Sequence, residues 1–209
     1  VYVRQWADID TDTRYSTLWL VEATGKNPRP LTEGRRHDAS PRWSPDGTHL
    51  AYVAEVDGRA QIVVRTLATG ETAAITHLTQ PPTSITWSPD SRSIAYGSLV
   101  EEAPRHIADL PAPPAQARWA EPAKVYDRLV YRFDGVGYLK PGHTQLFVVS
   151  ASGGASRQIT HCPTDCGGTP LSPAHLDWTP DGRFLITSLN VNSDPEVEVH
   201  DTDVYEIRI

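Results

Sequence analysis

The feature that most limits what this chain can fold into is a repeat centred on tryptophan. Three segments carry Trp-Ser-Pro-Asp-Gly or a close variant followed by a short apolar run, and their tryptophans are Trp43, Trp87 and Trp178. The first two tryptophans lie 44 residues apart and the last two lie 91 apart, which is one repeat of similar length plus a large insertion. Repeats of roughly 40–45 residues that are rich in turn signals indicate the four-stranded blades of a β-propeller.

A second motif alternates with the first and supplies the remaining strands of each repeat. It is an apolar run followed by a Gly-containing turn and a short segment ending in threonine, and its copies begin at Leu18, Ile62 and Leu146. A last partial copy, Val204–Ile207, ends the chain. Within the first motif, Ser44–Gly47 fits a type I turn, with Pro at the position of preset φ and Gly last. We therefore expect four antiparallel strands per repeat, with the tryptophans and β-branched residues in the core.

These spacings predict an all-β chain that forms a partial β-propeller of four-stranded antiparallel blades, two complete and two incomplete. The predicted blades cover residues 1–36, 37–80, 81–161 with the insertion, and 170–209, all as approximate bounds. The first blade lacks its first strand, and the last one stops before its fourth. Propellers close with four to eight blades because an open arc leaves strand edges exposed.

The ends of the chain suggest a piece of a longer protein. The first residues, Val1–Trp6, are already strand-like and resemble neither a signal peptide nor a transit peptide, and the chain contains no methionine. We expect the open edges of the arc to be covered either by further chain or by other copies in a homo-oligomer.

The composition of the chain limits the kinds of molecule that it is expected to bind. The 209 residues carry 19 basic and 26 acidic side chains, a formal net charge of -7, so the phosphate backbone of a nucleic acid is not an expected partner. The sequence has no run of 18 apolar residues, so we expect no membrane-spanning helix. With 39% hydrophobic and 22% charged residues, the chain is typical of a soluble globular protein.

The insertion in the third blade holds the candidate binding residues. The pattern breaks between Ser98 and His143, and long insertions in a compact repeat either carry function or form a solvated loop that caps one face. Glu101 and Glu102 can bind the cationic N-terminus of a peptide.

Three further candidates, Tyr131, Arg132 and Asp134, lie later in the insertion. They are candidates for contact with a substrate or with a neighbouring domain. For Arg132 and Asp134 we favour a structural interpretation, in which the two charges pair and hold the loop, because aromatic residues surround them.

Two short motifs resemble metal sites only in part. The run Asp8–Asp12 imitates the start of a calcium loop, but such a loop needs Gly at its sixth position and Glu at its twelfth, where this chain has Thr13 and Trp19. We interpret it as a polar hairpin loop.

The only two cysteines lie close together in the chain. His161, Cys162 and Cys166 offer three zinc ligands, but a lone Cys-x3-Cys without a second pair is a weak signal. A local disulfide or two free thiols is the preferred interpretation. No metal or cofactor is predicted for this chain.

The repeats and the insertion together resemble those of a known family. Its Trp-Ser-Pro-Asp-Gly repeats, of the TolB and WD40-like PD40 type, are similar to those of the periplasmic TolB protein and of serine peptidases of the prolyl oligopeptidase family. The segment Tyr131–Tyr138, followed by Gln145–Val149 and Arg157–Thr160, resembles the propeller of the acylaminoacyl-peptidase branch.

The resemblance implies a parent protein with two domains. A propeller would gate and select peptide substrates for a C-terminal α/β-hydrolase domain that holds a Ser-Asp-His triad. The partners would then be that domain and a peptide, and the location would be the cytoplasm. This chain has no Gly-x-Ser-x-Gly motif and no alternation of strands and helices, so no catalytic residue can be assigned to it.

The alternative is a TolB-like propeller that binds protein partners, has no enzymatic role and resides in the periplasm. A hydrolase motif downstream in the parent protein would favour the peptidase. A signal peptide and a small α/β domain upstream would favour TolB.

Overall fold

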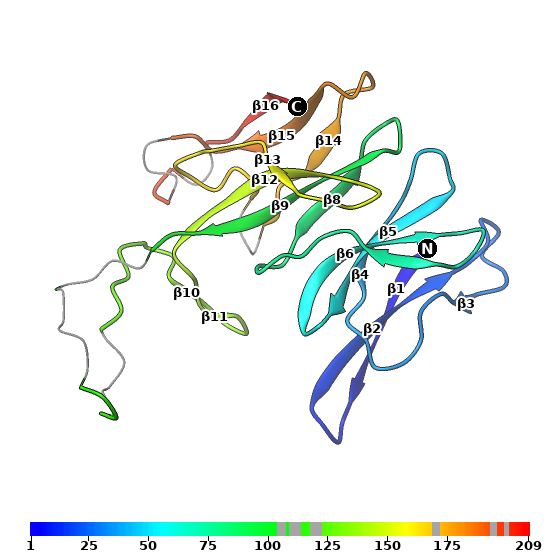
Figure 1. Ribbon diagram of the computed structural model, residues 1–209, viewed down its shortest axis with the longest axis horizontal. Helices are drawn as coiled ribbons and strands as arrows, with labels where there is room; N and C mark the ends of the chain where they lie inside the picture. The colour runs from blue at the N-terminus through cyan, green and yellow to red at the C-terminus, as the bar shows by residue number, and fades with distance from the viewer. Residues whose placement is uncertain (104–107, 109–113, 118–122, 169–171, 193–195, 199–200) are drawn as a thin grey trace.

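The described part of the chain folds into β-strands and loops. The computed structural model describes residues 1–103, 108, 114–117, 123–168, 172–192, 196–198 and 201–209, and these residues contain no helix. In this described part, no helix could therefore span a membrane. Four antiparallel sheets of three or four strands follow one another along the described part of the chain, and Figure 1 shows them succeeding one another from the N-terminal end in blue to the C-terminal end in red.

Two sheets are complete blades with four strands. The first has the order β4-β5-β6-β7 and the second has the order β13-β12-β9-β8. The strands of the first are β4 (Ala39–Trp43), β5 (His49–Val56), β6 (Arg59–Thr66) and β7 (Thr72–Ala74). Those of the second are β8 (Thr83–Trp87), β9 (Ser93–Glu101), β12 (Gly142–Ser150) and β13 (Arg157–Gln158).

The outer two sheets have three strands each. The N-terminal sheet contains β1 (Tyr2–Asp8), β2 (Thr13–Leu20) and β3 (Arg29–Pro30). The C-terminal sheet contains β14 (Leu176–Trp178), β15 (Phe184–Leu189) and β16 (Asp203–Arg208). The predicted fold class is confirmed: the chain is all-β and has two complete and two incomplete blades. Each sheet lies within one of the four predicted blade ranges.

The Ser-Pro-Asp-Gly segment forms a hydrogen-bonded turn between the first two strands of the blade. The amide of Gly47 donates to the carbonyl of Ser44 at 2.9 Å, which closes a turn of four residues. Gly47 has a φ of 70°, in the left-handed region that favours glycine. The Ser44 hydroxyl donates to the Asp46 carboxylate at 2.6 Å, and Asp46 also accepts from the amide of Thr48 at 2.9 Å. Side chain and backbone together fix the link between the first two strands of the blade.

Two of the three motif tryptophans link their blade to the one before it. The indole N–H of Trp87 donates to the carbonyl of Arg42 in the preceding blade at 2.9 Å. In the same way, the indole N–H of Trp178 donates to the carbonyl of Thr86 at 3.4 Å. The core cluster between the two complete blades includes Trp87, whose surface is only 6% exposed. The motif tryptophan is thus a contact between blades.

The prediction that all three motif tryptophans lie in the core is wrong for Trp43, which is 41% exposed. The strand that would present a carbonyl to its indole is the innermost strand of the first blade. In the described residues that blade begins with β1, which corresponds to the second strand of a complete blade. Among the described residues, no strand of the first blade takes that inner position beside Trp43.

The turn carboxylates predict a loss of stability in acid. Hydrogen bonds from the Ser44 hydroxyl and from the Thr48 amide and hydroxyl lower the pKa of Asp46 to about 2. Bonds from the Thr179 hydroxyl and from Arg183 lower the pKa of Asp181 to about 2. Both folded pKa values lie below the unfolded value of about 3.9, so this stabilisation is complete above about pH 5 and is lost as the pH falls toward 2. We expect the urea midpoint to decrease over that range.

A double variant provides the control for this prediction. With Asp46→Asn and Asp181→Asn, two of the carboxylates no longer titrate, so the urea midpoint should depend less on pH between 5 and 2. An unchanged acid dependence in the double variant would mean that other groups cause the acid sensitivity.

Candidate functional site

The insertion of the third blade leaves and rejoins the sheet at one point. β9 continues to Glu101 and β12 begins at Gly142, and these two residues pair across the strands. The strands therefore extend beyond the predicted break between Ser98 and His143, and the insertion spans residues 102–141. Within it, β10 (Arg132–Phe133) and β11 (Gly137–Tyr138) form a short hairpin. Figure 1 shows the β10–β11 hairpin lying apart from the strands of the larger sheets.

Gly142 closes the base of the insertion. Its φ is 119°, and a Cβ at this position would overlap the carbonyl oxygen of Val100 and lie 2.9 Å from the Cα of Glu101. Only glycine lets the returning chain pass this close to the departing strand. The start of β12 is therefore fixed by backbone sterics.

The two predicted glutamates differ in their surroundings. Glu101 accepts from the ammonium of Lys140 at 3.1 Å and from the side-chain amide of Gln80. The Glu102 side chain is 63% exposed, and its carboxylate lies 3.9 Å from Nε2 of His143. Glu101 thus helps to close the base of the insertion, whereas Glu102 is the more accessible of the two to a ligand.

Three tyrosines gather on the insertion and form what we call the tyrosine patch, Tyr126, Tyr131 and Tyr138. Their ring centres lie 5.1–6.2 Å apart. Each ring is 40–60% exposed, and the neighbouring apolar residues are exposed as well: Val125, Leu129, Val130 and Val136. Contiguous exposed apolar surface of this kind typically marks an interaction site.

Arg132 contacts the tyrosine patch. Its guanidinium carbon lies 5.7 Å from the ring centre of Tyr138, within the range of a cation–π contact. The described part of the insertion contains no ion pair between Arg132 and Asp134, so the pairing favoured from the sequence is not formed. The structure brings Tyr131 and Arg132 to one patch. Tyr126 was not among the predicted site residues, because nothing in its spacing relates it to the hairpin.

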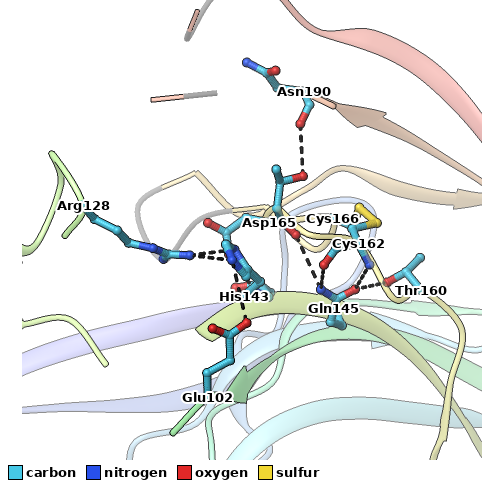
Figure 2. A network of polar contacts seen from close by, with 11 residues as sticks. Glu102, Arg128, His143, Gln145, Thr160, Cys162, Asp165, Cys166 and Asn190 are labelled. Atoms are coloured by element: carbon cyan, nitrogen blue, oxygen red, sulfur yellow. Dashed lines mark hydrogen bonds and ion pairs between the residues drawn. A yellow bond between two sulfur atoms is a disulfide. The ribbon is translucent and has the colours of Figure 1, made fainter. Parts of the chain in front are cut away.

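A charged cluster lies where the insertion rejoins the sheet (Figure 2). His143, the second residue of β12, lies between Glu102 and Asp165, with Nδ1 3.8 Å from the Asp165 carboxylate. A guanidinium nitrogen of Arg128, within the insertion, contacts His143 Nδ1 at 2.7 Å. His143 therefore connects the insertion to the loop that follows the third blade.

That loop contains the two cysteines, which form a disulfide. Both sulfur atoms are engaged with each other in this form of the protein. The described residues contain no group of three or more His, Cys, Asp or Glu side chains that could hold a metal ion. The Asp165 carboxylate accepts from the backbone amide of Thr144 at 2.7 Å, which joins the loop to β12.

A clamp of glutamine and threonine also holds this loop. The side chain of Gln145 accepts from the Thr160 hydroxyl at 2.8 Å and from the amide of Cys162 at 3.0 Å, and it donates to the Cys162 carbonyl at 2.9 Å. These bonds are visible in Figure 2. The arrangement can position a loop and present charges, but it contains no nucleophile paired with a base.

Comparison with known proteins identifies the repeats. The sequence profile described as the TolB beta propeller domain, PD40, matches residues 1–110. The uncharacterized peptidase YuxL of Bacillus subtilis is 29% identical over 202 residues, which cover 96% of this chain and 29% of the peptidase. The Tol-Pal system protein TolB of Alkalilimnicola ehrlichii is 40% identical, but over 60 residues that cover 29% of this chain and 14% of TolB.

Solved structures show the same fold. The acylaminoacyl peptidase of Pyrococcus horikoshii superposes with a TM-score of 0.66 at 18% identity, over 99% of this chain and 29% of that one. TolB of Acinetobacter baumannii gives a TM-score of 0.56 at 18% identity, over 91% of this chain and 34% of that one. The chain thus spans about a third or less of the length of these relatives. The resemblance inferred from the sequence is confirmed, since TolB and the peptidases share the repeats and the propeller fold.

Proposed function

The chain belongs to the TolB beta propeller domain family, and from its similarity to a peptidase along 96% of its length we propose that it is the propeller portion of a serine peptidase. In this proposal it gates and selects peptide substrates for an α/β-hydrolase domain of the same polypeptide. It holds no catalytic residue itself, and its location is the cytoplasm.

The extent of the match supports the peptidase over the TolB alternative. The similarity to the Bacillus subtilis peptidase covers 96% of this chain and so includes the insertion, whereas the matches to TolB sequences cover 24–33%. A TolB-like role as a protein-binding propeller remains the second candidate, because the repeats themselves are of the TolB type.

The tyrosine patch is the surface we assign to the hydrolase domain. It combines exposed aromatic rings with an arginine, and both are enriched at the centres of protein interfaces. Glu102 lies at the base of the same insertion, where its exposed carboxylate can receive the ammonium group of a peptide.

The endogenous polypeptide that contains these residues tests the proposal. It should react with a serine-directed fluorophosphonate and hydrolyse short acylated or free peptides. A polypeptide of the expected length that neither reacts with the probe nor cleaves peptides, but captures envelope proteins, would favour the TolB alternative.

Removing the tyrosine patch should make the gate less selective. In that polypeptide, Tyr131→Ser with Tyr138→Ser should lower the preference for short over long peptides by about thirtyfold, because losing interface anchors costs about 2 kcal/mol. The ratio of kcat/KM for a short and a long peptide measures this preference.

Tyr2→Ser is the matched control, since Tyr2 is 40% exposed but lies on β1 in the first blade. An equal loss of selectivity in the control would contradict the assignment of the patch.

A further inference from the structure

The disulfide loop of the third blade has a direct counterpart in the second blade. There Gln61 accepts from the Thr76 hydroxyl at 2.9 Å and from the amide of Leu78 at 2.7 Å, and it donates to the carbonyl of Leu78 at 3.0 Å. These are the bonds that Gln145 makes with Thr160 and Cys162. The same clamp thus holds the equivalent segment of both complete blades.

The comparison isolates what the disulfide adds. The clamp of the second blade forms without any cysteine, so the clamp does not require a disulfide. The cysteines are four residues apart, and the entropic stabilisation from a cross-link decreases as the closed loop becomes shorter. The effect of this bond on the whole fold is therefore small compared with its effect on the residues it encloses.

Those residues include the contact with the insertion. Asp165, next to Cys166, accepts from the amide of Thr144 and faces His143. His143 in turn contacts Arg128 in the insertion and lies near Glu102 at its base. A continuous series of contacts runs from the disulfide to the insertion, and Figure 2 shows its members side by side.

We propose that the Cys162–Cys166 disulfide is a redox-controlled lock on the part of the insertion around Arg128. When the bond is formed, the loop holds Asp165 against β12 and Arg128 stays anchored through His143. When the bond is reduced, Asp165 is released and the contact between Arg128 and His143 loosens. The proposal concerns the anchoring of the insertion and holds whatever surface the insertion contacts.

The exposure of the two cysteines indicates how a thiol would open the lock. Cys162 is partly exposed, whereas Cys166 is 1% exposed, so Cys162 is the more accessible of the two residues. The thiolate of an external dithiol attacks Cys162 Sγ, the bond between the two cysteines breaks, and Cys166 leaves as a thiolate that takes up a proton. The second thiol of the reductant then closes its own disulfide and releases Cys162 as a thiol.

Limited trypsin cleavage of the 209-residue chain tests the lock. With reduced dithiothreitol, cleavage after Arg128 should be about tenfold faster than with oxidised dithiothreitol, because local opening governs cleavage of a folded chain. Cleavage after Arg59, an exposed residue in the β5–β6 hairpin of the second blade, should not change. Mass spectrometry of the fragments gives both rates.

Two variants distinguish loss of this lock from a general loss of stability. Cys162→Ser with Cys166→Ser should be cleaved rapidly after Arg128 in either buffer. Asp165→Ala keeps the disulfide but loses the contact, and it should also be cleaved rapidly in both.

Three results would overturn the proposal. The first is an unchanged rate after Arg128 on reduction, and the second is slow cleavage in the Asp165→Ala variant. The third is equal acceleration after Arg59, which would make the disulfide a support for the whole fold.

Discussion

Replacing Trp87 by alanine is expected to lower the free energy of unfolding by about 3–5 kcal/mol, whereas the same change at Trp43 should cost only about 1 kcal/mol. The two residues occupy the same place in the repeat. Trp87 is 6% exposed, belongs to the core cluster and donates to the carbonyl of Arg42. Trp43 is 41% exposed, so its removal leaves a smaller cavity. Urea unfolding monitored by circular dichroism measures both losses.

The pair of variants serves as its own control, because the local sequence around the two tryptophans is almost the same. A Trp43 variant that loses as much stability as the Trp87 variant would contradict the interpretation. It would mean that Trp43 is covered in solution by a strand or by a second copy of the chain.

Replacing Gly142 by alanine is expected to cost about 3 kcal/mol or more, because its Cβ would overlap backbone atoms rather than a side chain that can move. The carbonyl of Val100 can yield only if β9 and β12 separate where they support the insertion. We expect lower stability in urea together with faster proteolysis of the insertion.

Gly135 provides the control within the same insertion. It also has a positive φ, 78°, but no atom lies within 4 Å of the Cβ position. Gly135→Ala should therefore cost only the strain of the backbone, about 1 kcal/mol. Equal losses at the two positions would show that strain rather than overlap limits Gly142.

The repeats made the fold predictable. Trp87 and Trp178 each precede the same kind of turn. The alternation of apolar and polar residues in a strand and the residues of a turn are local features, so they can be recognised in a single sequence. The environment of Trp43 was not predictable in this way, because its exposure depends on which strand lies beside it. Local pattern identifies a strand but does not say whether a neighbour covers it.

The insertion was predicted as a segment but not in its contacts. Its borders follow from the break in the repeat, whereas the partners of His143 come from residues at positions 102, 128 and 165. No periodicity connects these positions. The sequence also left open whether the two cysteines form a disulfide or stay free thiols. That outcome depends on the path of the loop, which the hydrogen bonds of Gln145 fix.

Two tryptophan hydrogen bonds join neighbouring blades in the same way. The indoles of Trp87 and Trp178 donate to the carbonyls of Arg42 and Thr86, each in the preceding blade. A hydrogen bond stabilises the donor blade and the acceptor blade alike, so each bond couples the stability of two neighbours. In a repeat protein whose stability is set by contacts between neighbours, losing one such bond should weaken both of the blades that it joins.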